Sequence, residues 1–207
     1  MKLYFSPASP FSRKARIAAA LLGLDDRIEL VATDTGNPMD AIRVKNPLGK
    51  IPTLERDDGA CLYDSAVIVA YLDALAGGGR IIPADPEARF AVLAREALGD
   101  GIAEASILQV YEKRMRAESE YSANWVAHQR GKVERALATL EAAPPERIAP
   151  AKGGQPQVDI GAIALACALG YLDLRFEGAW RASYPRLVAW LDSFGAAVPA
   201  FEATKAA

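Results

Sequence analysis

The sequence KLYFSPASPFSRKARIAAALL occupies residues 2–22 and decides the predicted fold. Its start alternates in hydrophobicity and carries two aromatic side chains, which is typical of a short β-strand. Ser9 is a preferred helix cap and Pro10 a preferred first helical residue, so we expect a helix through residue 22. Gly23 ends that helix, and residues 28–33 supply a second strand. A helix between two strands predicts a βαβ unit.

A β-hairpin and a further helix are predicted after this unit. A short helical segment is broken by Asn46-Pro47-Leu48-Gly49. The turn residues Asp57-Asp58-Gly59 then separate two short apolar runs, which is a hairpin pattern. An apolar helix follows over residues 66–72, with Ser65 placed to cap it. The predicted order of the N-terminal part is βαβαββα.

The clearest change in composition begins at Gly77-Gly78-Gly79 and extends to Pro86. We therefore expect an α/β domain over residues 1–78, a linker over 79–86 and an all-helical bundle domain over 87–207. Helical spacing covers residues 87–118, 122–142, 158–173 and 184–197, and proline and glycine residues between 144 and 154 mark a loop. The fold class is thus α/β followed by all-α.

Composition argues against several classes of function. The net charge is −2 and the charges of both signs are interspersed, so we expect no nucleic-acid partner. No apolar stretch is long enough to span a bilayer and no leader pattern precedes the first strand, so we expect a cytoplasmic protein without a membrane partner. Cys61 and Cys167 are interpreted as core residues, and the single His128 cannot make a histidine-rich metal site.

Ser9 lies at the first strand-to-helix turn, where chemistry is expected. Free backbone N–H groups and the positive end of the helix dipole favour an anion there, and a thiolate is one such anion. The alternative is that Ser9 is only a helix cap.

Two further turns carry polar or special residues. Pro52 falls at the beginning of a strand, where a proline in the common trans form is the simplest explanation. Asp64 and Ser65 lie at a helix N-terminus, where backbone amides could hold a carboxylate and Asp64 could meet an ammonium group. Capping alone would also explain both residues. The order of the three features along the chain is matched by chance less easily than any one of them, so together they are a more specific indication of function.

With these residues, the sequence resembles the cytosolic glutathione S-transferases over nearly the whole chain. The resemblance rests on Ser9-Pro10-Phe11, Lys50-Ile51-Pro52 and Asp64-Ser65, and it is strongest to bacterial members with a Ser-Pro-aromatic turn. It implies a thioredoxin-like N-terminal domain that binds glutathione, a helical domain, a homodimer, and an electrophile site in the cleft between the domains. The chain departs from the family at Pro156, where a hydroxyl residue usually stands three positions before Asp159.

The resemblance assigns the sulfur of glutathione to the first turn. Ser9 would hydrogen-bond the sulfur and favour its thiolate, and Phe11 would line its surroundings. Tyr4 and Ser6 are close enough to leave the identity of the sulfur ligand open. We prefer Ser9 because a helix N-terminus adds dipole stabilisation. Position 12 is also a serine, so a reaction that needs two protein thiols is not expected.

The rest of glutathione is assigned in the same way. Pro52 would be cis, and the Ile51 backbone would pair with the cysteinyl part as an added strand does. Asp64 and Ser65 would bind the γ-glutamyl end. Lys50 would attract the glycyl carboxylate, although a solvated Lys50 is an equal alternative. This assignment requires glutathione as the co-substrate, and no metal or nucleotide is expected.

Candidates for the electrophile site lie in the helical half. Tyr111, Arg114 and Met115 would line the cleft, and the simpler alternative is that they belong to a charged, solvated helix face. Trp125, Trp180 and Trp190 are interpreted as packing residues.

The predicted function is that of a glutathione S-transferase that attacks a small electrophile, with a role in detoxification. A thiol with a pKa of about 8.5 is only a few per cent ionised at neutral pH, and a decrease of about two units corresponds to roughly 2.7 kcal/mol. The same thiolate would serve conjugation, peroxide reduction, isomerisation or dehalogenation. The alternative is a non-catalytic glutathione-binding or protein-interaction module, because fold alone does not separate the two.

Overall fold

The computed structural model describes residues 1–149 and 156–206. Its N-terminal part contains a four-stranded mixed sheet with the strand order β2-β1-β3-β4. β1 pairs in parallel with β2 and antiparallel with β3, and β3 pairs antiparallel with β4. The strands are β1 (Lys2–Phe5), β2 (Glu29–Ala32), β3 (Thr53–Glu55) and β4 (Cys61–Leu62).

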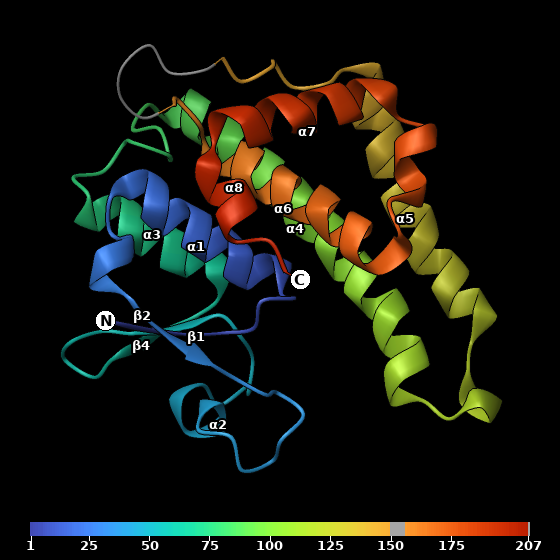
Figure 1. Ribbon diagram of the computed structural model, residues 1–207, viewed down its shortest axis with the longest axis horizontal. Helices are drawn as coiled ribbons and strands as arrows, with labels where there is room; N and C mark the ends of the chain where they lie inside the picture. The colour runs from blue at the N-terminus through green and yellow to red at the C-terminus, as the bar shows by residue number, and fades with distance from the viewer. Residues whose placement is uncertain (150–155, 207) are drawn as a thin grey trace.

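Helices cover both faces of this sheet. α1 (Pro10–Leu22) and α3 (Ser65–Leu75) lie on one face and the short α2 (Ile42–Lys45) on the other (Figure 1). Gly23 ends α1 with a φ of 69°, a left-handed conformation that glycine adopts without steric cost. A 3₁₀ turn, η1 (Asp25–Arg27), leads into β2.

The segment after α3 is fixed by a buried carboxylate. Asp73 accepts hydrogen bonds from the backbone N–H groups of Gly79, Arg80 and Ile81, at 3.0, 3.0 and 2.9 Å. Ile81 and the next residue, Ile82, are buried in the core. The residues predicted as a linker are therefore anchored to α3 along part of their length.

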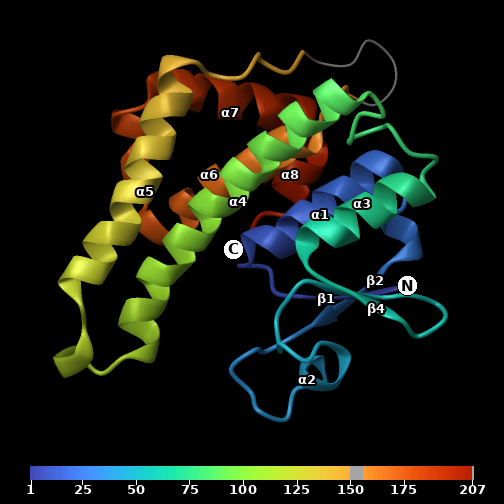
Figure 2. The ribbon, with the colours of Figure 1, turned by 180° about the vertical axis from the view of Figure 1, so that it is seen from behind.

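The C-terminal part is entirely helical in the described residues. α4 and α6 cross in its centre, and α5 and α7 lie outside them (Figures 1 and 2). Gly99 permits the crossing, since a Cβ there would lie 2.8 Å from the backbone of Ala164. The elements are α4 (Pro86–Met115), η2 (Glu118–Glu120), α5 (Ala123–Ala142), α6 (Ile160–Phe176), η3 (Ala179–Ala182), α7 (Pro185–Ala197) and α8 (Pro199–Ala203).

The predicted fold class is confirmed, with corrections at single residues. Trp180 and Trp190 are buried, but Trp125 is 42% exposed and stacks on His128. Cys61 is only half-buried, because the two-residue β4 is the edge strand of the sheet. Residues 150–155 of the predicted loop lie outside the described residues. None of the described helices is long and apolar enough to cross a membrane.

The sequence did not predict how α6 begins. Asp159 caps it by accepting a hydrogen bond from the Ala162 N–H at 2.9 Å, and it also binds Arg95 of α4. The hydroxyl that is missing at Pro156 is therefore replaced in its capping role by the carboxylate itself.

Candidate functional site

Ser9 is the N-cap of α1. Its Oγ accepts a hydrogen bond from the Ser12 N–H at 3.2 Å, and its own N–H donates to the Ser6 carbonyl at 3.1 Å. A hydroxyl can accept and donate at the same time, so the Ser9 hydrogen is still available to a ligand. Phe11 packs against the hydrophobic core in the first turn of the same helix. This turn presents a hydroxyl donor at the positive end of a helix dipole.

Tyr4, an alternative sulfur ligand, has its hydroxyl hydrogen engaged elsewhere. Tyr4 Oη donates to Glu55 Oε2 at 2.8 Å, and the other oxygen of Glu55 accepts from Lys45 Nζ. Burial, helped by the hydrogen bond to Glu55, raises the pKa of Tyr4 to about 12. The Tyr4 hydroxyl is therefore a neutral donor to Glu55, which favours Ser9 or Ser6 as the residue that faces the sulfur.

The loop before β3 is organised by one buried amide. Asn46 donates to the Lys50 carbonyl at 3.0 Å and to Thr53 Oγ1 at 3.1 Å, and Thr53 Oγ1 donates to the Lys50 carbonyl at 2.9 Å. The peptide bond between Ile51 and Pro52 is cis, as the resemblance implied. The ladder between β1 and β3 ends at the pair of Tyr4 and Thr53, so the Ile51 backbone lies beyond it.

The cap of α3 lies one residue earlier than predicted. The Asp64 side chain accepts a hydrogen bond from the Ala66 N–H at 3.1 Å, whereas Ser65 is already the first helical residue. The carboxylate takes the cap because it accepts a free N–H of the first turn and is favoured by the helix dipole. Asp64 is exposed and Ser65 is buried, and the peptide bond between Tyr63 and Asp64 is also cis.

A cavity of about 510 Å³ adjoins Ser9. Its other walls come from α1, α6, α7, α8 and the tail, and include Arg13, Tyr171 and Leu174. Arg13 is buried, donates to the Phe201 carbonyl and lies over the Phe201 ring at 3.9 Å, so it fastens α8 to α1. Sequence reasoning did not find this cavity, because its walls meet only in the folded chain.

The candidates on α4 lie near this cavity without lining it. Tyr111 is 41% and Met115 62% exposed. Burial raises the pKa of Tyr171 and Arg175 opposes this rise, with smaller effects from Tyr111, which raises the pKa, and Arg114, which lowers it. Tyr171 itself lines the cavity. The end of α4 and the cavity are therefore neighbouring surfaces, joined at Tyr171.

Comparison with known proteins identifies the family. The model of the glutathione S-transferase N-terminal domain matches residues 3–80, and that of the C-terminal domain matches residues 123–193. The uncharacterised GST-like protein YibF of Escherichia coli K12 is 33% identical over 189 residues, which are 91% of this chain and 90% of YibF. This chain belongs to the glutathione S-transferase family.

Solved glutathione transferases share the whole architecture. A family member from Pseudomonas fluorescens Pf-5 with bound glutathione is 39% identical with a TM-score of 0.87, and the match covers 100% of this chain and 98% of that one. The same target with bound S-(propanoic acid)-glutathione matches at 38% identity and a TM-score of 0.84, over 100% of both chains. A glutathione S-transferase from Methylobacillus flagellatus KT with glutathione bound is 35% identical with a TM-score of 0.88, over 100% of this chain and 99% of that one.

In this glutathione transferase fold, a buried ion pair joins the two parts of the chain. Lys14 of α1 is 1% exposed, and its Nζ binds Glu96 Oε1 at 2.9 Å and Asp100 Oδ2 at 2.6 Å, both on α4. Burial opposes the charge of Lys14, but the two carboxylates raise its pKa overall. Burial raises the pKa of Asp100 and outweighs the lowering effect of Lys14, and Glu96 and Asp64 raise it further. The sequence gave no signal for this contact, because charged residues in helices usually face solvent.

The described residues contain no group of three or more His, Cys, Asp or Glu side chains that could hold a metal ion. His128 is exposed beside Trp125, at 5.8 Å between ring centroids.

Proposed function

We propose that this chain is a glutathione transferase in which Ser9 stabilises the thiolate of bound glutathione. The observation that carries the proposal is the geometry of Ser9, whose Oγ accepts the Ser12 N–H at the start of α1 and donates its hydrogen to no acceptor among the described residues. Donation from that hydroxyl and the helix dipole both favour the charged form of a thiol. The protein supplies ionisation and position, and glutathione supplies the nucleophile.

The pose of glutathione follows from the three turns. The Ile51 backbone would pair with the cysteinyl part, Asp64 and Ser65 would bind the γ-glutamyl end, and Lys50 would attract the glycyl carboxylate. Two solved relatives, 35% and 39% identical, hold glutathione, which supports this proposal. Phe11 would line the surroundings of the sulfur.

The electrophile would reach the sulfur through the cavity beside Ser9. The Pseudomonas relative that holds S-(propanoic acid)-glutathione supports a small substituent on the sulfur. The cavity adjoins Ser9 directly, whereas Tyr111, Arg114 and Met115 would form an outer wall at the end of α4.

A homodimer is also part of the proposal. The exposed face of α4 carries an apolar stripe at helical spacing, and Figure 2 shows α4 beside α3 on the side turned to the viewer. Phe90 is 69% and Leu108 39% exposed on this stripe. Its members are Phe90, Ala94, Ala97, Gly101 and Leu108, and the exposed Glu104 interrupts it between the last two. Sedimentation velocity would show a dimer, and a monomer at micromolar concentration would contradict it. The cytoplasmic location and the role in detoxification stay predictions.

Replacement of Ser9 by alanine tests the proposed chemistry. We expect Ser9→Ala to raise the pKa of the bound glutathione thiol by about one to two units, and to lower turnover at neutral pH by roughly 10- to 100-fold. The thiol pKa is measured from the ultraviolet absorbance of the thiolate against pH, and turnover from conjugation of a chromogenic aryl halide.

Ser122 provides a matched control. It caps α5 with the same geometry as Ser9, accepting the Trp125 N–H at 3.2 Å. Both alanine variants should lose about 1 kcal/mol of stability, but only Ser9→Ala should lose turnover. Equal turnover of Ser9→Ala and wild type would contradict the role of Ser9. Tight glutathione binding by the wild type, without turnover on a broad panel of electrophiles, would favour a non-catalytic module instead.

A further inference from the structure

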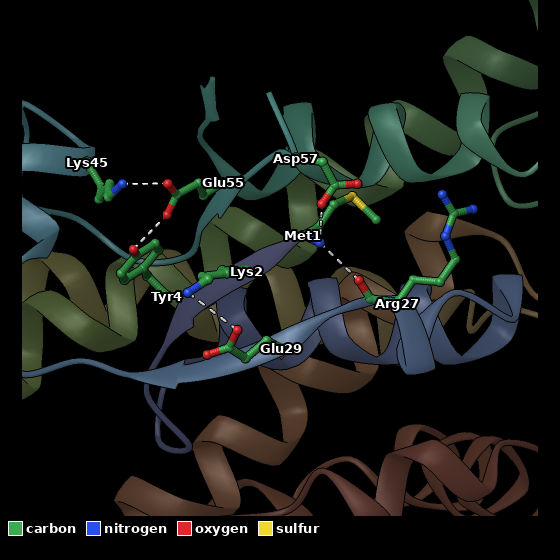
Figure 3. A network of polar contacts seen from close by, with 8 residues as sticks. All are labelled: Met1, Lys2, Tyr4, Arg27, Glu29, Lys45, Glu55 and Asp57. Atoms are coloured by element: carbon green, nitrogen blue, oxygen red, sulfur yellow. Dashed lines mark hydrogen bonds and ion pairs between the residues drawn. The ribbon is translucent and has the colours of Figure 1, made fainter. Parts of the chain in front are cut away.

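Three residues from three separate elements form a polar cluster on the face of the sheet that α2 covers. Tyr4 of β1 donates to one oxygen of Glu55 on β3, at 2.8 Å, and Lys45 at the end of α2 donates to the other oxygen (Figure 3). Figure 3 also shows Lys2 of β1 paired with Glu29 of β2. Lys2 lies opposite Glu55 in the ladder of β1 with β3, and its charge helps to lower the pKa of Glu55.

The cluster keeps one charge state over a wide range of pH. Burial, with the hydrogen bond to Glu55, raises the pKa of Tyr4 to about 12. The hydrogen bond to Glu55 raises the pKa of Lys45, and hydrogen bonds from Lys45 and Tyr4 lower the pKa of Glu55. The cluster should therefore consist of a neutral tyrosine, a carboxylate and an ammonium group from about pH 5 to about pH 9.

Lys45 connects this cluster to the glutathione loop. The next residue, Asn46, is 1% exposed and holds the Lys50 carbonyl and Thr53 Oγ1. The chain then reaches Ile51, whose backbone is proposed to pair with glutathione. The start of this loop is tied to the sheet through Glu55 and Tyr4, and its end through β3.

We propose that Tyr4 and Glu55 are positioning residues for glutathione binding, acting through Lys45 and the loop that carries Ile51. The inference rests on the proposed function, because it needs glutathione to pair with the Ile51 backbone. Main-chain pairing has narrow distance limits, so a small displacement of the loop weakens it. In this proposal Tyr4 holds the loop in place through Glu55 and Lys45 and does not contact the sulfur of glutathione.

Kinetics of Tyr4→Phe distinguish positioning from direct contact. We expect the KM for glutathione to rise about 3- to 10-fold, while kcat at saturating glutathione stays within about twofold of wild type. The pH profile of kcat should be unchanged, because the thiol is ionised at Ser9. Lys45→Met, at a partly exposed side chain, should raise the KM for glutathione in the same way without removing a buried group.

Arg130→Gln is the control, since it breaks an exposed ion pair with Glu134 on α5, away from the sheet and from α2. It should leave the KM for glutathione unchanged. A fall in kcat with a shifted pH profile in Tyr4→Phe would overturn the inference in favour of a sulfur contact. An unchanged KM in both Tyr4→Phe and Lys45→Met, with only lower thermal stability, would overturn it in favour of a purely structural role.

The failure of this inference can be told from the failure of the proposed function. Calorimetry of the wild type with glutathione measures binding without turnover. A wild type that does not bind glutathione overturns the proposed function, and this inference with it. A wild type that binds glutathione, beside a Tyr4→Phe variant that binds it equally well, overturns the inference alone.

Discussion

The two sides of the proposed site are held in different ways. On the glutathione side, most hydrogen bonds that fix the turns are local: they join residues two or three positions apart at Asp64 and Ser9, and four or seven positions apart at Asn46. The bond from Tyr4 to Glu55 is the long-range exception. On the electrophile side, the walls of the cavity are fixed by distant contacts, such as that from Arg13 to Thr204, 191 positions along the chain. The glutathione side can therefore be damaged one turn at a time, whereas the electrophile side depends on how the two parts of the chain pack.

The largest loss of stability should follow from breaking the ion pair that joins α1 to α4. Lys14→Met removes the ammonium group and leaves the buried Glu96 and the partly buried Asp100 without their cation. Loss of one partner of a buried ion pair costs about 3–5 kcal/mol, which urea unfolding at pH 7 would measure. Arg95→Met is the control, because Arg95 is also on α4 but its ion pair with Asp159 is partly exposed. This substitution should lower the free energy of unfolding by less than about 1 kcal/mol.

Stability against pH sharpens the same prediction. The pKa of Lys14 is raised in the folded chain, so its contribution is complete below the unfolded value of 10.5 and is lost as pH rises through the folded value. The difference in unfolding free energy between wild type and Lys14→Met should therefore shrink above that pH. A difference that stayed constant into strong alkali would show that the charge of Lys14 is not what stabilises the contact.

A smaller effect, on the KM for the electrophile, should distinguish the cavity beside Ser9 from the end of α4 as the electrophile site. Leu174 lines the cavity beside Ser9, so Leu174→Trp should fill part of it and raise the KM for the electrophile about tenfold. Met115→Ala should change that KM less, because Met115 is 62% exposed. Neither variant should alter the KM for glutathione. A larger effect of Met115→Ala would place the electrophile at the end of α4.

The contrast between short-range and long-range contacts also explains which features could be predicted from the sequence. Ser9, Pro52 and Asp64 were found because capping and turn preferences act over a few residues, and the resemblance then assigned them to glutathione. Even so, the cap of α3 was assigned to Ser65 in place of Asp64, since both residues are good caps and local rules do not rank them.

Contacts between distant segments could not be predicted in this way. Lys14 is one of several charged residues in α1, and nothing in its neighbours shows that it is buried against α4. Tyr4 was a candidate sulfur ligand because of its place near the first turn, and only the register of β1 with β3 shows that its hydroxyl meets Glu55. Such partners follow from packing, for which a single sequence carries no short-range signal.

The smallest effect should decide whether Asp64 is more than a cap. Asp64→Asn keeps a good N-cap, so stability should change by less than about 0.5 kcal/mol, but it removes the charge that would meet the γ-glutamyl ammonium. An exposed ion pair contributes about 0.2–1 kcal/mol, so the Kd for glutathione in calorimetry should rise by up to about fivefold. Asp85 is also an aspartate N-cap, of α4, and accepts the Ala88 N–H at 2.9 Å, so Asp85→Asn is the control and should leave the Kd unchanged. Equal Kd values in both variants would reduce Asp64 to its structural role, and the glutathione side would then depend on Ser9 and the Ile51 loop alone.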